Sequence, residues 1–236
     1  MGEYLTMDNL MQNTSKPKIT IIIFTFNEEK NLPFILPKIP NWVDEVLLVD
    51  GHSTDNTISV ARELFPKIRI ELQPNKGKDD ALQYGVSLAT GDIVITLDGD
   101  GNTNPEEIPN FIKPLLNGYD FAKGSRFLTV KPLHMPKHRF WGNWVLSTEV
   151  NLLFGTRFTD VCSGYNSFWK KAWEKIRFPE EFGYEPLIII RAKKAGLKIT
   201  EVSSLDTGRI SGDSKLPSWH QGWYAFKTIL KERFHG

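Results

Sequence analysis

Two aspartates, Asp98 and Asp100, follow directly after the apolar run Ile93 to Leu97. A short apolar run bounded by glycine is typical of a buried strand, and open α/β sheets bind their ligands at the carboxyl ends of such strands. Because adjacent carboxylates repel each other, we expect Mg²⁺ or Mn²⁺ between them, bridging to a diphosphate. The alternative is an ordinary surface turn, since Asp-Gly-Asp-Gly-Asn is rich in turn-forming residues.

Polar residues also follow two earlier apolar runs. Thr25 and Glu28 come at the end of the β-branched run that starts at Lys18, and Asp50 ends the run Glu45 to Val49. The carboxyl ends of parallel strands meet at one edge of a sheet. We therefore expect these side chains and the aspartate pair to converge.

Strands and helices that would position these residues alternate along the chain. The expected strands span 18–25, 45–49, 68–72, 93–97, 121–125 and 198–202. The expected helices begin after Asn27, after Ser53 or Thr54 as cap, at Lys78, at Asn104-Pro105, at Gly142, at about Glu185 and at Trp219. This order implies βαβ units with a mostly parallel central sheet, and so the α/β fold class. We predict a flexible arm over 1–17, a single Rossmann-like domain over 18–217 and a C-terminal amphipathic helix over 218–236.

Composition excludes several classes of protein. Lys and Arg number 29 against 28 Asp and Glu, so a nucleic-acid partner has no support from overall charge. The single cysteine, Cys162, excludes an internal disulfide framework and fits a reduced cytosolic compartment. No uninterrupted apolar run reaches the ~20 residues that span a bilayer. We expect a cytoplasmic protein without a transmembrane segment.

Four blocks in the first half of the chain resemble the family 2 glycosyltransferases of the GT-A fold, in that family's order and spacing. They are Thr25–Leu32, Val49–Thr57, Asn75–Leu82 and Leu97–Asp100. Three later blocks resemble the branch of polyprenyl-phosphate glycosyltransferases typified by dolichyl-phosphate mannose synthase. These are Asp120–Arg126, Asp160–Asn166 and Arg209–Leu216.

The resemblance implies roles for the matching residues. The nucleotide of the donor would be bound by Thr25, Phe26, Glu28, Asp50, Gly77, Lys78, Asp98 and Gly99. The metal and the donor diphosphate would be held by Asp98, Asp100 and Asn102. The catalytic residues would be Asp100, Arg126, Arg209, Lys215 and Glu185. The chain departs from the pattern at Gly51, where the family usually has a second aspartate, and one ribose contact is therefore in doubt.

The acceptor depends on whether a general base is present. A hydroxyl needs a base to attack an anomeric carbon, whereas a phosphate monoester, with a second pKa of ~6, is already largely dianionic. Family members with sugar acceptors usually carry paired acidic residues on a late helix, and here Glu185 is followed by Pro186. This favours a phosphate acceptor. Alternatively, Glu185 is a first-turn helix carboxylate, or Glu185 or Asp160 is the base for a hydroxyl acceptor.

Two helical segments combine aromatic and basic residues. Apolar residues at helical spacing are Trp141, Trp144, Val145 and Leu152 in one segment, and Trp219, Trp223, Phe226, Ile229, Leu230 and Phe234 in the other. Lys137 and Arg139 precede the first, and Lys227, Lys231 and Arg233 are interleaved with the second. Such helices lie in membrane interfaces, and a core-facing stripe is the alternative.

The predicted function is inverting, metal-dependent transfer of a hexosyl unit from GDP- or UDP-hexose to a polyprenyl or dolichyl phosphate. The enzyme would contact the cytosolic membrane face peripherally. Inversion is what the family resemblance implies. Two alternatives remain: transfer to a sugar or small-molecule hydroxyl, and a non-catalytic nucleotide-sugar-binding subunit.

Overall fold

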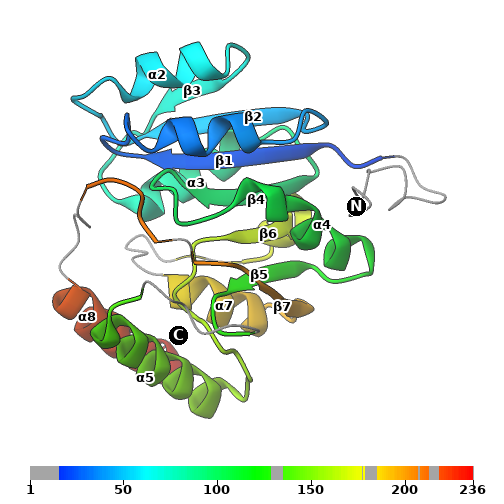
Figure 1. Cartoon of the computed structure of the whole chain (residues 1–236). Helices are drawn as coiled ribbons and strands as arrows, with labels where there is room; N and C mark the ends of the chain where they lie inside the picture. The colour runs from blue at the N-terminus through cyan, green and yellow to red at the C-terminus, as the bar shows by residue number, and fades with distance from the viewer. Residues whose placement is uncertain are drawn as a thin grey trace, which may run out of the picture.

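The computed structural model describes residues 16–128, 135–176, 178, 185–206, 208–212 and 218–235. These residues contain a seven-stranded sheet with the order β3-β2-β1-β4-β6-β5-β7 (Figure 1). The strands are β1 (Ile19–Thr25), β2 (Glu45–Asp50), β3 (Arg69–Leu72), β4 (Ile93–Asp98), β5 (Phe121–Ser125), β6 (Asn166–Trp169) and β7 (Ile199–Ser203). All neighbours pair in parallel except β6, which is antiparallel to both β4 and β5. The predicted α/β class with a mostly parallel sheet is confirmed.

Helices cover both faces of the sheet. They are α2 (Thr57–Leu64), α3 (Lys78–Leu88), α4 (Ile108–Leu116), α5 (Lys137–Phe154), α6 (Lys170–Trp173), α7 (Glu185–Lys194) and α8 (Ser218–His235), with 3-10 helices η1 (Leu32–Phe34), η2 (Leu36–Lys38) and η3 (Pro105–Glu107). Alternate residues of β1 enter two separate cores: Ile22 packs in the core that includes α3, and Ile21 in the core that includes α4. Because β1 is buried on both faces, it is apolar almost throughout rather than alternating.

The register of the parallel strands brings the predicted polar residues together. Phe24 on β1 pairs with Asp98 on β4, and Thr25 pairs with Asp50 on β2. The polar ends of three strands therefore lie side by side at one edge of the sheet.

Three local predictions were wrong. The helix expected after Asn27 is replaced by η1 and η2, because Asn27 adopts a left-handed φ of 56° and Pro33 and Pro37 interrupt any continuous helix. Neither Ser53 nor Thr54 caps α2, which begins at Thr57. Strand β6 was not predicted, since it is short and begins with two polar residues. By contrast, a helical segment does begin at Asn104-Pro105 as expected, and the Asn104 side chain caps η3 by accepting from the Glu106 amide at 3.2 Å.

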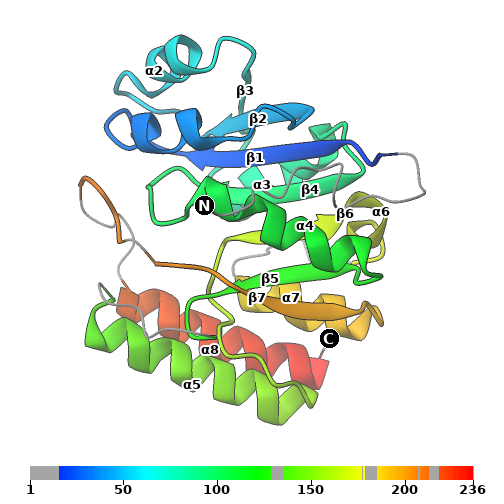
Figure 2. The same cartoon turned by 45° about the vertical axis from the view of Figure 1, so that its right-hand side comes forward.

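Helices α5 and α8 pack against each other beyond the β7 edge of the sheet (Figure 2). Helix α5 begins at Lys137, earlier than the predicted Gly142. Its buried side includes Leu146, Glu149 and Val150, while Trp141 and Trp144 are exposed. No helix within the described residues is long and apolar enough to cross a membrane.

Candidate active site

The two aspartates lie on a tight turn at the end of β4. The Gly99 amide donates to the Phe24 carbonyl at 2.9 Å, which ties the turn to β1. A Cβ on Gly99 would lie 2.7 Å from that same oxygen, so a larger residue would displace the turn. The turn places Asp98 and Asp100 at the carboxyl edge of the sheet, where the sequence predicted them.

Lys78 joins Asp98 to Glu185. Its Nζ lies 2.6 Å from Asp98 Oδ1 and 2.9 Å from Glu185 Oε1. Burial acts to lower the pKa of Lys78, but the two carboxylates outweigh it and raise this pKa above its ordinary value. Burial likewise acts to raise the pKa of Glu185, but the Lys78 ammonium lowers it. At neutral pH the lysine is therefore protonated and Glu185 is ionised.

Asp100 is held by its own turn. Its carboxylate accepts from the Asn102 backbone amide at 3.0 Å and from the Asn102 side chain at 2.9 Å. Burial first, and then the nearby Asp98 carboxylate, raise the pKa of Asp100 to about 6. A cation bound at the turn would therefore offset both the burial of Asp100 and its repulsion by Asp98.

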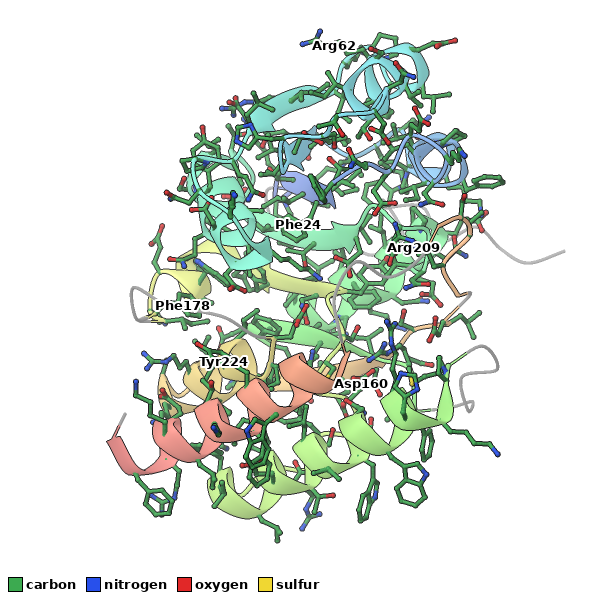
Figure 3. The ribbon with its side chains drawn as sticks, turned by 90° about the vertical axis from the view of Figure 1, so that its left-hand side faces the viewer. Phe24, Arg62, Asp160, Phe178, Arg209 and Tyr224 are labelled. Atoms are coloured by element: carbon green, nitrogen blue, oxygen red, sulfur yellow. The ribbon has the colours of Figure 1, made fainter. Side chains whose placement is uncertain are left out.

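Arg209 approaches this pair from the segment between β7 and α8 (Figure 3). Its Nη1 lies 3.6 Å from Asp100 Oδ2, and its Nη2 donates to Glu28 at 2.6 and 2.7 Å. Glu28, which the resemblance assigned to the nucleotide pocket, is buried and holds this arginine. Lys215, another of the predicted catalytic residues, lies outside the described residues.

Arg126 pairs with Asp160 rather than with the aspartate turn. Its Nε and Nη2 donate to the two Asp160 carboxylate oxygens at 2.7 and 3.0 Å. Although burial acts to raise the pKa of Asp160, the Arg126 guanidinium lowers it. Asp160 is therefore a buried, ionised anchor for Arg126, and its low pKa makes it a weak general base.

A second polar group lies at the ends of β1 and β2. Asp50 is fully buried and accepts from Thr25 Oγ1 at 2.8 Å and from the Ser53 amide and hydroxyl at 2.7 and 2.6 Å. Ser53, expected as a helix cap, thus orients Asp50 instead. Phe26 beside them is 46% exposed, which leaves an aromatic surface at this edge. Gly77, before α3, has a φ of 102° that favours glycine.

Two residues of the site were not predicted individually. A Cβ on Gly164 would lie 2.6 Å from Lys78 Nζ and 2.8 Å from Asp98 Oδ2. The Lys78–Asp98 ion pair therefore packs directly against the backbone of Gly164, where a side chain would not fit. Lys123 is buried, and its Nζ donates to the Ser163 carbonyl at 2.8 Å. Burial lowers the pKa of Lys123. Gly164 belongs to the block Asp160–Asn166, but only the folded structure shows that it lies against Asp98.

The residues at the turn fit a divalent cation. Mg²⁺ is commonly held by one or two carboxylates while substrate phosphates and water complete its coordination. Asp98 and Asp100 supply such oxygens, with Lys78 and Arg209 limiting their excess negative charge. Across the described residues no group of three or more His, Cys, Asp and Glu side chains could hold a metal. Two carboxylates with a substrate diphosphate are the arrangement that this donor set supports.

The fold and this site define a glycosyltransferase of the GT-A type. Residues 20–177 match the family described as Glycosyl transferase family 2, and the chain belongs to that family. It is 28% identical to the dolichyl-phosphate hexose transferase of Haloferax volcanii over 90% of this chain and 92% of that protein. It is 30% identical to the dolichol-phosphate mannosyltransferase of Pyrococcus furiosus over 84% of this chain and 59% of that protein.

Among solved structures, the chain resembles glucosyl-3-phosphoglycerate synthase of Mycobacterium tuberculosis, crystallised with Mn²⁺, uridine diphosphate and phosphoglyceric acid. The TM-score is 0.74 and the identity 20%, over 97% of this chain and 82% of that one. At this identity the likeness concerns the fold, and it agrees with the GT-A class.

Proposed function

We propose that the chain transfers a hexosyl unit from a GDP- or UDP-sugar to a polyprenyl or dolichyl phosphate, with inversion at the anomeric carbon. An oxygen of the acceptor phosphate forms the bond to that carbon while the bond to the diphosphate oxygen breaks. The nucleoside diphosphate leaves with the electron pair, and no proton has to be removed from the acceptor.

The donor would lie along the carboxyl edge of β2, β1 and β4. Its nucleoside would bind beside Thr25, Phe26, Asp50 and Gly77, and its diphosphate beside Asp98, Asp100 and Asn102. When bound, Mg²⁺ or Mn²⁺ would neutralise charge that develops on the leaving diphosphate. Arg209 would add to this stabilisation, because its Nη1 is directed towards Asp100. A small, mostly apolar pocket lies beside Lys78, with Asp79 and Asn166 among the residues that line it.

The observation that carries the choice of acceptor is the Lys78–Glu185 ion pair. A hydroxyl acceptor requires a carboxylate ready to accept a proton near neutral pH. Glu185 is instead 2.9 Å from an ammonium group that lowers its pKa, which makes it a poor base. A phosphate acceptor needs no base, and its charge would be bound by Arg209, which lies beside Asp100, together with Arg126, to which the resemblance also assigns a catalytic role. The names of the Haloferax and Pyrococcus relatives agree with this acceptor.

A lipid acceptor also requires access to a membrane, and the outer faces of α5 and α8 support that. Trp141, Trp144 and Leu152 on α5 are 58%, 55% and 80% exposed, and Trp223 and Phe234 on α8 are 56% and 68% exposed. Exposed basic residues accompany them: Lys137, Arg139, Lys227, Lys231 and Arg233. Aromatic residues beside basic ones suit an anionic membrane surface. Part of α8 faces inward, since Ile229 is buried. The side chain of Trp219 is not among those that the structure describes.

One experiment tests the whole proposal. The protein is incubated with single nucleotide sugars, Mg²⁺ or Mn²⁺, and either a polyprenyl phosphate or the matching polyprenol, and the products are identified by mass spectrometry. A hexosyl polyprenyl phosphate formed only from the phosphate supports the proposal. Products formed only on hydroxyl acceptors would replace it with the hydroxyl-acceptor alternative.

A further inference from the structure

The segment that carries Arg209 crosses the carboxyl edge of the sheet, from β7 back towards β1 (orange in Figure 1). Its start is fixed to η3, since the Leu205 amide and the Ser204 hydroxyl each donate to Glu107 at 3.1 Å. Residues 208–212, which we name the Arg209 loop, then reach the turn after β1. The loop therefore bridges two elements that are distant in the sequence.

A ring of hydrogen bonds attaches the Arg209 loop to the turn after β1. Arg209 Nη2 donates to both oxygens of Glu28 at 2.6 and 2.7 Å, and its Nε donates to the Ser211 carbonyl at 2.9 Å. The side-chain Nδ2 of Asn31 closes the ring, donating to Glu28 Oε2 at 2.5 Å and to the Ser211 carbonyl at 3.2 Å. Glu28 and Asn31 are 7% and 2% exposed, so water competes little for these bonds.

A second contact places the same loop directly on the aspartate turn. The Ile210 amide donates to the Asp100 carbonyl at 3.4 Å. A Cβ on Gly101 would lie 2.6 Å from Ile210 Cδ1, so the isoleucine side chain rests on the bare glycine. With Nη2 and Nε held by the ring, Nη1 of Arg209 is left 3.6 Å from Asp100 Oδ2.

We propose that Glu28 and Asn31 are positioning residues that hold Arg209 against the aspartate turn, so that Glu28 acts on transfer through Arg209 and not by touching the nucleotide. A lone carboxylate beside a diphosphate would repel it, whereas a carboxylate bound to a guanidinium orients that cation. Misplacing a catalytic group by about 1 Å is enough to slow a reaction ~10²-fold. The proposal rests on the proposed function for its effect on rate, but not for the position of the loop.

The position of the loop is tested on the protein without metal or substrate. Amide hydrogen exchange of peptides covering 205–212 is followed by mass spectrometry in the wild type, Glu28→Gln and Asn31→Ala. We expect faster exchange in these peptides in both variants, while peptides from β4 stay unchanged. Glu29→Gln is the matched control, because Glu29 bonds to Asn56 and not to the loop. Wild-type exchange in both variants would overturn the proposal.

Kinetics of a double-mutant cycle then separate positioning from nucleotide binding. Glu28→Gln should lower kcat at least ~10-fold with a smaller change in the donor KM, as expected for a displaced catalytic group. In an Arg209→Ala background, Glu28→Gln should lower kcat by less than ~3-fold, since the arginine that Glu28 orients is no longer present. Multiplicative losses, or a loss confined to KM, would mean that Glu28 contacts the nucleotide itself. A chain that transfers no sugar would refute the proposed function, while hydrogen exchange would still decide on the loop.

Discussion

Lys78, the first residue of α3, and Asp98, the last residue of β4, form an ion pair of 2.6 Å at the edge of the sheet. The pair rests on Gly164, whose missing side chain leaves room for it. A cation supplied by the chain is thus already in contact with a carboxylate predicted to bind metal.

Replacing Lys78 by methionine should destabilise the metal-free protein by about 1–3 kcal/mol, because Asp98 and Glu185 lose the charge between them and are only partly exposed. Mn²⁺ should raise the Tm of this variant more than that of the wild type, since a divalent ion restores positive charge near Asp98. Lys76→Met, which changes an exposed lysine in the same block, is the control. Equal Mn²⁺ shifts in all three proteins would contradict the prediction. Differential scanning fluorimetry provides the measurement.

Asp98→Ala and Asp100→Ala should fold but lose transfer activity, because the donor diphosphate and its cation lose their anchor. Asp92→Ala provides a control at the opposite end of β4, where that aspartate accepts from the Lys18 amide. Initial rates with and without excess EDTA measure the effect. Full activity in EDTA, or wild-type turnover of either variant, would exclude the metal bridge.

Glu185→Gln should lower turnover by less than ~10-fold, because a phosphate acceptor needs no enzyme base and a lost base costs ~10²–10⁴-fold. Arg209→Ala should have the larger effect, since it removes a contact to charge that develops during transfer. Thermal stability is checked in the same preparations, as the glutamine also weakens the bond to Lys78. The reverse order, with an inactive Glu185→Gln enzyme and a nearly normal Arg209→Ala enzyme, would make a hydroxyl acceptor the better hypothesis.

Features that depend on residues close together in the sequence could be predicted, whereas contacts between residues far apart in the sequence could not. The strands β1, β2 and β4 were predicted because short continuous apolar runs can be recognised without knowledge of the rest of the chain. Helix α3 was predicted with its observed bounds, Lys78–Leu88. The aspartate turn followed from adjacency along the sequence.

The partnerships within the site could not be predicted in this way. Glu28 and Arg209 are 181 positions apart, and Lys78 and Glu185 are 107 apart, so only the folded sheet brings them into contact. The resemblance assigned a role to each of these residues. It assigned Glu28 to the nucleotide and gave no partner for Lys78, because motifs record positions and not contacts.

If the outer faces of α5 and α8 meet a membrane, the protein should co-sediment with vesicles that contain anionic lipid and dissociate as salt is raised. A Trp141→Ser/Trp144→Ser variant should bind at least ~10-fold more weakly, because two interfacial aromatic side chains are lost. Truncation after Pro217 should also weaken binding. Phe34→Ser is the control, since Phe34 is 50% exposed but lies in η1. If the wild type does not co-sediment with these vesicles at low salt, the prediction of membrane contact is wrong.

Glu149 on α5 should make stability depend on pH. Both its carboxylate oxygens are buried without a hydrogen-bond partner among the described residues, and burial raises the pKa of Glu149 to about 7. The folded state keeps the proton that the unfolded chain releases at a lower pH, near ~4.3. The free energy of unfolding therefore falls as the pH rises from ~4.3 to about 7, and it does not fall further above pH 7 on account of this group.

Glu149→Gln should accordingly raise the Tm by a few degrees at pH 8, corresponding to about 1 kcal/mol, and have little effect at pH 4.5. Thermal melts across this range measure it, with Glu63→Gln on the exposed side of α2 as the control. A Tm difference that stays constant with pH would show that Glu149 does not titrate as described.

The antiparallel strand β6 divides the sheet into two halves that come from different parts of the sequence. The half β3-β2-β1-β4 is built entirely from residues up to Asp98, and the half β5-β7 from Phe121 onwards. The residues predicted to bind the donor come mostly from the first half, whereas Arg126, Asp160 and Glu185 come from the second. The two halves join where β4 pairs with β6, and Gly164 lies just before β6, where its carbonyl accepts from Thr96 Oγ1 at 2.7 Å. A side chain at Gly164 would therefore disturb the Lys78–Asp98 ion pair at the junction that both halves of the sheet share.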